Sequence, residues 1–434
     1  VDVDTTKNEL ENMNKKICKE LISIAFPAMG ENLLQMLMGM VDSYLVASLG
    51  IVALSGVSIA NNLLAVYQAV FIALAAAVSS QLAHVVGKEK GMQITAIVTD
   101  SVKLTVYVGV FLGILAVILG PTLLTSLGAE REVAQLGGLY LILVGGSILL
   151  LGLMTCLGGI LRTLGQPRYP MYISLFSNLL NAVFSAIAVF VLHTGVAGVA
   201  FGTILSRIVG CGLLWSRLSI SIKPSAWSVD KELVRLALPA IGERLMMRAG
   251  DVVIVGMITG LGTAVVAGNA IGETITQFNY MPTLGISVAT LIMTAKSRQD
   301  SLAVQRIYRI GLGLSLIFMF VIGGISYLAG PLLISLFTMD VQVAQASQTV
   351  LLYSVLGVPF TAANLVFTGL WQGMGNARLP FYATGIGMWV VRIGLAYFLI
   401  KNFQLGLPSI WLATIVDNAF RASLLYVRFR YSTG

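Results

Sequence analysis

Three polar side chains occupy one side of an apolar stretch near the start of the chain. Glu31, Gln35 and Asp42 are separated by 4 and 7 residues, so on a helix turning about 100° per residue they point within about 40° of one another. No lysine or arginine lies between them to neutralise the two acids. Such a carboxylate could hold Na⁺ together with amide and hydroxyl oxygens, or it could hold a proton, because burial favours its neutral form.

Two later apolar stretches supply further oxygen atoms at a similar depth. Asn181, Ser185 and Thr203 lie about 10 to 16 Å below the outer ends of their stretches, at 1.5 Å per residue, and Asp42 lies about 6 Å below its own. We therefore predict one ion- or proton-coupling site formed by Asp42, Asn181, Ser185 and Thr203, with Glu31 on the same stripe as Asp42.

The later half of the chain holds a second set of buried charges. Glu243, Arg244, Arg248 and Asp251 share an arc of about 140° on one predicted helix, and Arg248 and Asp251 have the spacing of an ion pair. The four formal charges sum to zero, so the set fits a structural ion network as well as part of a substrate site. The substrate or second-bundle polar network is predicted to contain Gln35, Tyr44, Glu243, Arg244, Arg248, Asp251, Glu273 and Arg392.

Composition indicates that membrane helices position these residues. The 434 residues are 57% hydrophobic and only 11% charged, whereas a soluble domain has about 25% charged residues. The chain is predicted to be an all-α polytopic membrane protein with twelve transmembrane helices, each about 20 residues or longer. The predicted spans are 21–46, 51–80, 96–119, 135–160, 170–192, 195–216, 233–258, 264–293, 307–330, 345–372, 380–400 and 406–427.

The two halves of the chain are copies of one unit. Residues 19–50 return as residues 231–262 with 12 of 32 positions identical, and later motifs repeat at nearly the same offset. The buried acids are not all copied, because Asp42 corresponds to Ile254 in the second copy. Six spans is an even number, so both halves enter the membrane from the same side and should be related by a pseudo-two-fold axis along the membrane normal.

Positive charge sets the predicted orientation. We assign 22 of the 27 lysines and arginines, Arg207 among them, to one side of the membrane, which places both termini in the cytoplasm. The net charge of +8 is therefore a topology signal with some affinity for membrane lipids, and no nucleic acid partner is expected. The predicted segments are a polar N-terminal tail at 1–16, an N-terminal six-helix bundle at 17–216, a cytoplasmic linker at 217–231 and a C-terminal six-helix bundle at 232–430.

Several separated motifs resemble one transporter family. The chain is similar to the multidrug and toxic compound extrusion (MATE) family, in particular its DinF-like branch, over essentially its whole length. The motifs that carry the resemblance are FPAMGENLLQMLMGMVDSYLVASLGIVALSGVSIA, AHVVGKEKG, LRTLGQPRYP and GVAGVAFGT.

The resemblance implies a V-shaped pair of six-helix bundles around a central cavity. It implies export of drugs or other organic cations across a prokaryotic plasma membrane in exchange for H⁺ or Na⁺, with no cofactor besides the coupling ion. The family's first-helix aspartate, fifth-helix asparagine and sixth-helix threonine match Asp42, Asn181 and Thr203. We also expect a monomer, and we expect Pro27 and Pro239, near the start of each half, to act as hinges.

The sequence departs from the family at two positions. Related members of this branch carry an aspartate where this chain has Ser185, which favours H⁺ over Na⁺ because one carboxylate is lost. Other branches bind a cation with a seventh-helix glutamate and a tenth-helix aspartate, but the tenth span here has no acid. Asp417 and Arg421, four residues apart on the last span, are interpreted as a structural ion pair.

Two other functions are weighed against export. A flippase for a lipid-linked precursor would need several unpaired arginines to hold pyrophosphate, and the sequence offers only Arg244, Arg248 and Arg392 for this purpose, with acids nearby. An intramembrane enzyme would need a nucleophile and base or a metal cluster. The HExxH and GxSxG motifs of such enzymes do not occur in the sequence, so the chain is predicted not to be an enzyme.

Overall fold

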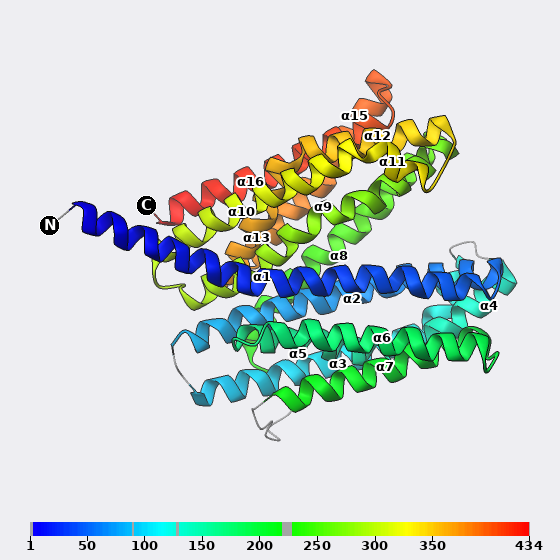
Figure 1. The fold of residues 1–434 in the computed structure, drawn as a ribbon, viewed down its shortest axis with the longest axis horizontal. Coiled ribbons are helices and arrows are strands. Elements are labelled where there is room, and N and C mark those ends of the chain that lie inside the picture. Colours follow the sequence, from blue (N-terminus) through cyan, green and yellow to red (C-terminus); the bar gives the residue numbers. More distant parts are fainter. Residues whose placement is uncertain (1–2, 89–90, 127–129, 219–227, 434) are drawn as a thin grey trace. The chain divides into compact units, whose positions relative to one another are not determined.

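The computed structural model describes residues 3–88, 91–126, 130–218 and 228–433. These residues form helices joined by short turns, with no strand among them (Figure 1). The elements of the first half are α1 (Val3–Ala47), α2 (Ile51–Val86), α3 (Gly91–Ser126), α4 (Arg131–Tyr140), the π-helical turn η1 (Leu141–Gly145), α5 (Ile148–Thr163), α6 (Arg168–Phe190) and α7 (Gly195–Arg217). The elements of the second half are α8 (Lys231–Thr259), α9 (Thr263–Lys296), α10 (Ser301–Leu328), α11 (Gly330–Ser335), α12 (Val341–Leu356), α13 (Val358–Gly373), α14 (Arg378–Ile386), the π-helical turn η2 (Gly387–Arg392), α15 (Ile393–Phe403) and α16 (Leu407–Thr433).

The described helices follow the order of the twelve predicted spans. Eight of them are long and apolar enough to cross a membrane, and two bent pairs raise that number to ten. The bent pairs are α4–η1 with α5, at 45°, and α12 with α13, at 59°. Two further long helices, α8 and α9, correspond to predicted spans but are less apolar. Helix α8 carries four charged residues between positions 243 and 251, and many hydroxyl and amide side chains lower the mean hydropathy of α9.

Two compact units make up the chain, and each is described by itself. The first unit contains Gly30–Ala237, and the second contains Val1–Met29 together with Leu238–Gly434. The boundaries therefore fall inside α1 and inside α8, close to Pro27 and Pro239. Most of the linker predicted at 217–231 lies outside the described residues.

Glycines allow the helices of the first unit to pack closely. A Cβ added to Gly56 of α2 would come within 2.6 Å of the carbonyl oxygen of Val133 in α4. The ring of Phe71 from α2 packs directly against Gly152 of α5, where a Cβ would come within 2.4 Å of a ring carbon. Backbones can approach this closely only where a side chain is missing, which is the usual basis of helix packing in membranes.

The second unit includes the first part of α1. Ala25 and Met29 of α1 lie against Gly285 of α9, and α9 also packs beside α10, α12 and α13. The indole of Trp371 in α13 donates a hydrogen bond to the carbonyl oxygen of Leu425 in α16 at 3.0 Å. The first part of α1 and the last helix, α16, therefore belong to the same compact unit.

Large apolar side chains are exposed on the outer helices. Phe111 and Ile118 of α3 are 62% and 67% exposed, and Ile317 and Ile325 of α10 are both 61% exposed. Helices that bury polar groups inward and present apolar surface outward are suited to lipid rather than to water.

Candidate functional site in the first unit and a charge network in the second

Asp42 sits at the centre of a small polar cluster in the first unit. The amide nitrogen Nδ2 of Asn181 donates to both carboxylate oxygens of Asp42, at 3.0 Å each. Ser185 donates in turn from Oγ to Oδ1 of Asn181 at 3.3 Å. Asn181 is 6% exposed and Ser185 is fully buried, so α1 and α6 bring these three predicted residues into one chain of hydrogen bonds.

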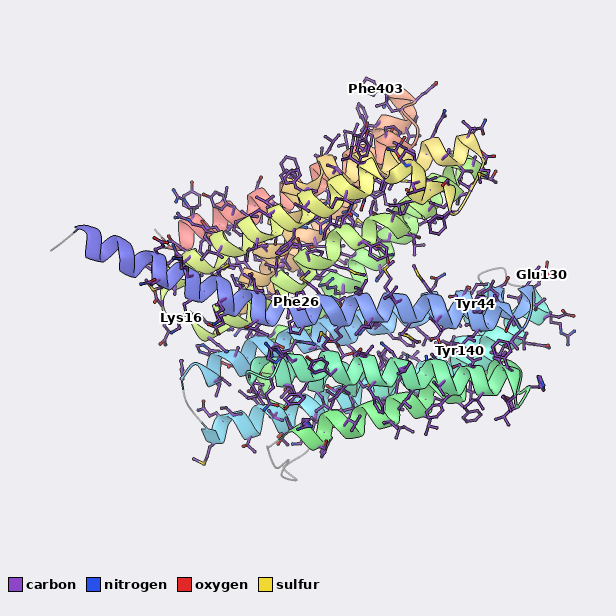
Figure 2. All side chains as sticks on the ribbon, in the orientation of Figure 1. Lys16, Phe26, Tyr44, Glu130, Tyr140 and Phe403 are labelled. Carbon is purple, nitrogen blue, oxygen red and sulfur yellow. The ribbon has the colours of Figure 1, made fainter. Side chains whose placement is uncertain are left out.

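Thr203 reaches the same region through a residue that the sequence analysis missed. Its hydroxyl donates to the carbonyl oxygen of Val199 one turn earlier on α7, at 3.1 Å, and its side chain is close enough to interact with that of Tyr140. Tyr140 is 4% exposed, at the end of α4 where η1 begins (Figure 2). The signal that the sequence offered was a tyrosine inside a predicted span, because a buried tyrosine hydroxyl needs a polar partner. The structure adds that it lies at a π-helical turn, and such turns are frequent at functional sites.

Arg207 was assigned wrongly to a cytoplasmic segment. It lies in the middle of α7, four residues after Thr203, and interacts electrostatically with Asp42 and Tyr140. Its Nη1 atom is buried and has no hydrogen-bond partner among the described residues. The distribution of lysine and arginine along the sequence shows the orientation of the helices, but it does not show which of these side chains are buried inside the bundle.

The other members of the predicted first-helix stripe have different surroundings. Glu31 forms an ion pair with Arg162 of α5, and Gln35 accepts a hydrogen bond from the amide of Gln68 in α2 at 3.2 Å. Tyr44, one turn from the end of α1, is 74% exposed (Figure 2). The stripe therefore divides into an ion pair, an amide pair and the Asp42 cluster.

An ion network forms the polar core of the second unit. Asp417 is fully buried and accepts from Nη2 of Arg392 at 2.8 Å and from Nη2 of Arg421 at 2.6 Å, which confirms the predicted Asp417–Arg421 pair. Arg392 also reaches Asp251 at 3.9 Å. Arg248, one turn away on α8, interacts electrostatically with Asp251 as its spacing suggested, but among the described residues no direct ion pair joins the two, and the ion-pair partner of Asp251 is Arg392.

Among the described residues, the hydrogen-bond partners of Glu243 are all neutral. It is 6% exposed and accepts from Gln372 of α13 at 3.3 Å and from Thr384 of α14 at 3.4 Å. Arg244, its neighbour on α8, is close enough to interact with it electrostatically. Glu273 of α9 lies close enough to Asn269, four residues earlier on its own helix, to interact with it, and it forms no ion pair among the described residues.

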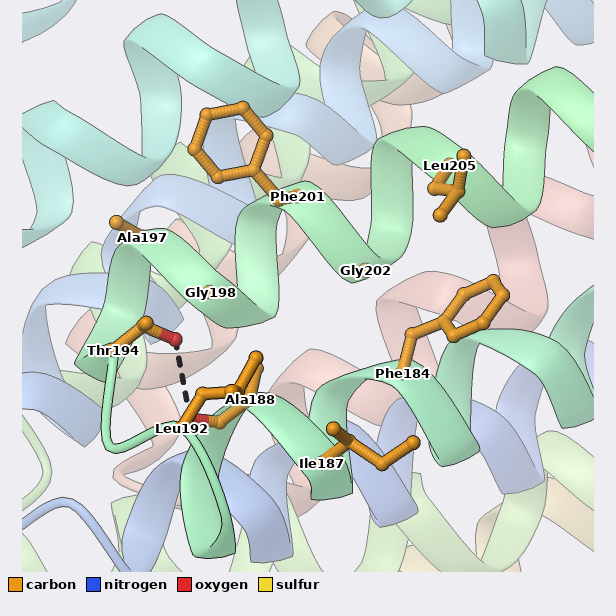
Figure 3. Close-up of a pocket in the computed structure, with 10 residues that line it drawn as sticks. All are labelled: Phe184, Ile187, Ala188, Leu192, Thr194, Ala197, Gly198, Phe201, Gly202 and Leu205. Carbon is orange, nitrogen blue, oxygen red and sulfur yellow. Dashed lines mark hydrogen bonds between the residues drawn. The ribbon is translucent and has the colours of Figure 1, made fainter.

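An apolar hollow of about 560 Å³ lies between α6 and α7 in the first unit (Figure 3). Phe184, Ile187 and Phe201 line its sides, and Gly198 and Gly202 form part of its wall. A Cβ on Gly202 would come within 2.9 Å of the hydroxyl of Ser185. Gly202 therefore separates the hollow from Ser185, which belongs to the hydrogen-bonded cluster of Asp42. The lining of the hollow itself is almost entirely apolar.

Comparisons with known proteins agree with this architecture. The probable multidrug resistance protein NorM of Thermotoga maritima is 31% identical over 95% of this chain and 92% of its own length. A MOP superfamily transporter from Pyrococcus furiosus has the same fold, with a TM-score of 0.88, 21% identity and 96% of each chain covered. A MATE structure in the bent conformation matches with a TM-score of 0.89, 20% identity and 97% of each chain covered.

Family membership follows from the extent of the sequence match. The pattern of the MatE family matches residues 27–187 and 239–398, one match in each half of the duplicated chain. The family consists of transporters and not of enzymes. The chain therefore belongs to the MatE family and is a multi-pass membrane transporter of the MATE fold.

Proposed function

We propose that this transporter exports drugs and other organic cations or amphiphilic toxic compounds by antiport with H⁺. The proposal is supported by the family and by the NorM relative, which is described as a probable multidrug resistance protein. Export against a gradient needs a group inside the membrane that binds the coupling ion in one state and releases it in another. Asp42 is our candidate for that group.

The observation that carries the proposal is the surrounding of Asp42. It lies inside a predicted span, and both of its oxygens face the single amide nitrogen of Asn181. The two hydrogen bonds from Asn181 and the nearby guanidinium of Arg207 favour the charged form of the carboxyl group. Burial opposes the charged form. A balance of this kind lets protonation follow the side of the membrane to which the site is open.

The proposed cycle is alternating access. A proton enters from outside and neutralises Asp42, the substrate leaves, and the transporter reopens to the cytoplasm, where the proton is released and new substrate binds. Substrate cations would be attracted by acids and by aromatic side chains such as Tyr44.

Ethidium export from inside-out vesicles tests the proposal. We expect export driven by a proton gradient, about tenfold or more slower in Asp42→Asn, because the amide keeps the shape of the side chain but cannot carry the charge. Asp340→Asn is the matched control: Asp340 caps α12 through its side chain, and asparagine also caps helices. Equal proton-driven export by wild type and Asp42→Asn would contradict the role of Asp42.

The lipid-linked flippase is the alternative function. It predicts no ethidium export under either a proton or a Na⁺ gradient, together with transfer of a pyrophosphate-linked lipid between leaflets. Arg392, one of the three arginines that such a site would use, is already bonded to Asp417, and this favours drug export.

A further inference from the structure

Arg207 is a charged side chain in an unusual position. It lies in the middle of α7, its Nη1 is buried, and no hydrogen bond or ion pair joins it to another described residue. A guanidinium inside a membrane protein is costly, and such residues normally pair with an acid or a backbone carbonyl. Leaving one without a bonded partner next to a predicted coupling site calls for a functional explanation.

The groups around Asp42 present donors rather than ligands for a metal ion. Asn181 turns its nitrogen to Asp42, and its oxygen already accepts from Ser185. A dehydrated Na⁺ needs several oxygens directed at one point. Of the oxygens in this cluster, only those of Asp42 carry a negative charge.

Charge decides further against a metal ion. In the part of the chain that the structure describes, the charged and titratable side chains that act on Asp42 are Arg207 from α7 and Tyr140 from α4. One carboxylate and one guanidinium sum to zero, so a bound Na⁺ or a bound proton would leave the same net positive charge in a buried place. Two positive charges in a medium of low polarity repel each other strongly. A proton is held against this repulsion by a covalent O–H bond, whereas Na⁺ would be held only by charge and by oxygen ligands.

We propose that Arg207 is a built-in cation that excludes Na⁺ and other monovalent metal ions from the Asp42 cluster, and so determines the ion specificity of the first unit. The inference rests on the proposed role of Asp42 in ion coupling. It adds a residue whose positive charge acts on Asp42 in place of the charge of a metal ion.

Direct binding of ²²Na⁺ to the purified, detergent-solubilised transporter tests this inference. Wild type should show no saturable binding that depends on Asp42. Removing the positive charge and adding a carboxylate, in Arg207→Met/Ser185→Asp, should create Na⁺ binding that Asp42→Asn abolishes. One neighbouring charge changes the affinity of a buried carboxylate for a proton by roughly 10 to 1,000-fold, and we expect a gain of that order for Na⁺.

Three controls keep the test decisive. Arg207→Lys/Ser185→Asp retains the positive charge and should bind little Na⁺. Arg217→Met removes an arginine from the last turn of α7, where it stacks on Tyr169, and should change nothing. Thermal unfolding identifies the variants that fold, and Arg207→Gln/Ser185→Asp replaces the methionine variant if that one does not.

Two outcomes would overturn the inference. One is Asp42-dependent ²²Na⁺ binding by wild type. The other is a folded, charge-depleted double variant that binds no Na⁺. Because the assay needs no substrate, it separates this inference from the export function: a protein that exports no ethidium can still pass or fail the Na⁺ test.

Discussion

Two glutamates at corresponding positions of the duplicated halves have partners of different charge. Glu31 and Glu243 occupy corresponding positions of the two copies, and so, at nearly the same offset, do Arg162 and Gln372. In the first unit the pair is ionic, whereas in the second unit Glu243 meets a neutral amide at 3.3 Å. Charge-assisted hydrogen bonds are normally shorter than that, so the contact between Glu243 and Gln372 is weaker than the ion pair of the first unit.

Asp417 should be the most costly acid to neutralise in the second unit. Asp417→Asn leaves Arg392 and Arg421 buried without a counter-ion, and breaking a buried pair costs about 3–5 kcal/mol. Asp251→Asn is the matched change, because its side chain is 44% exposed and lies 3.9 Å from Arg392. Thermal unfolding in detergent should show a clearly lower Tm for Asp417→Asn alone. An equal loss in both variants would mean that burial of the ion network contributes little.

At the scale of elements, the order of the helices was predictable and their bends were not. Apolar runs and the Gly and Pro turns between them fix where helices begin and end. The 59° bend between α12 and α13 falls at Gly357, just before Pro359 in the first turn of α13, in a segment predicted as one span, 345–372. Hydropathy averages over such a break and therefore cannot locate it. The same averaging hid Arg207 and Tyr140, because neither interrupts an apolar run.

Close helix contacts give a prediction at this scale. Gly56→Ala should lower the Tm, because the new methyl group would meet the carbonyl oxygen of Val133 and force α2 away from α4. Gly39→Ala on α1 meets nothing within 4 Å and should raise stability by about 0.5–1 kcal/mol, the difference in helix preference. Thermal unfolding of both variants measures the contrast. A similar effect in both would show that α2 and α4 can separate at little cost.

For the whole molecule, the sequence predicted two bundles but not where the helices that connect them belong. Repeat and linker signals suggest boundaries at 17–216 and 232–430, whereas the packing assigns Val1–Met29 to the unit that contains Leu238–Gly434. The apolar pattern of residues 21–46 predicts a helix, but it does not show against which of the two units each part of this helix packs. Only long-range contacts, such as that of Ala25 and Met29 with Gly285, carry this information.

The position of Pro27 beside a unit boundary leads to a prediction about transport. Proline inside a helix removes a backbone hydrogen bond and costs about 3 kcal/mol, so Pro27→Ala should make α1 more stable and less easily bent. We expect a higher Tm together with slower export, because alternating access requires the two units to move and both contain part of α1. Ethidium export and thermal unfolding, measured on the same preparation, test the two effects together.

Pro282→Ala is the control for the hinge, since Pro282 also lies inside a helix, α9, but within a single unit. If bending at the boundary matters, Pro27→Ala slows export more than Pro282→Ala does, and Pro239→Ala in α8 behaves like Pro27→Ala. If the three variants slow export equally, then proline acts through general helix flexibility. In that case the boundary between the units would have no special role in the transport cycle.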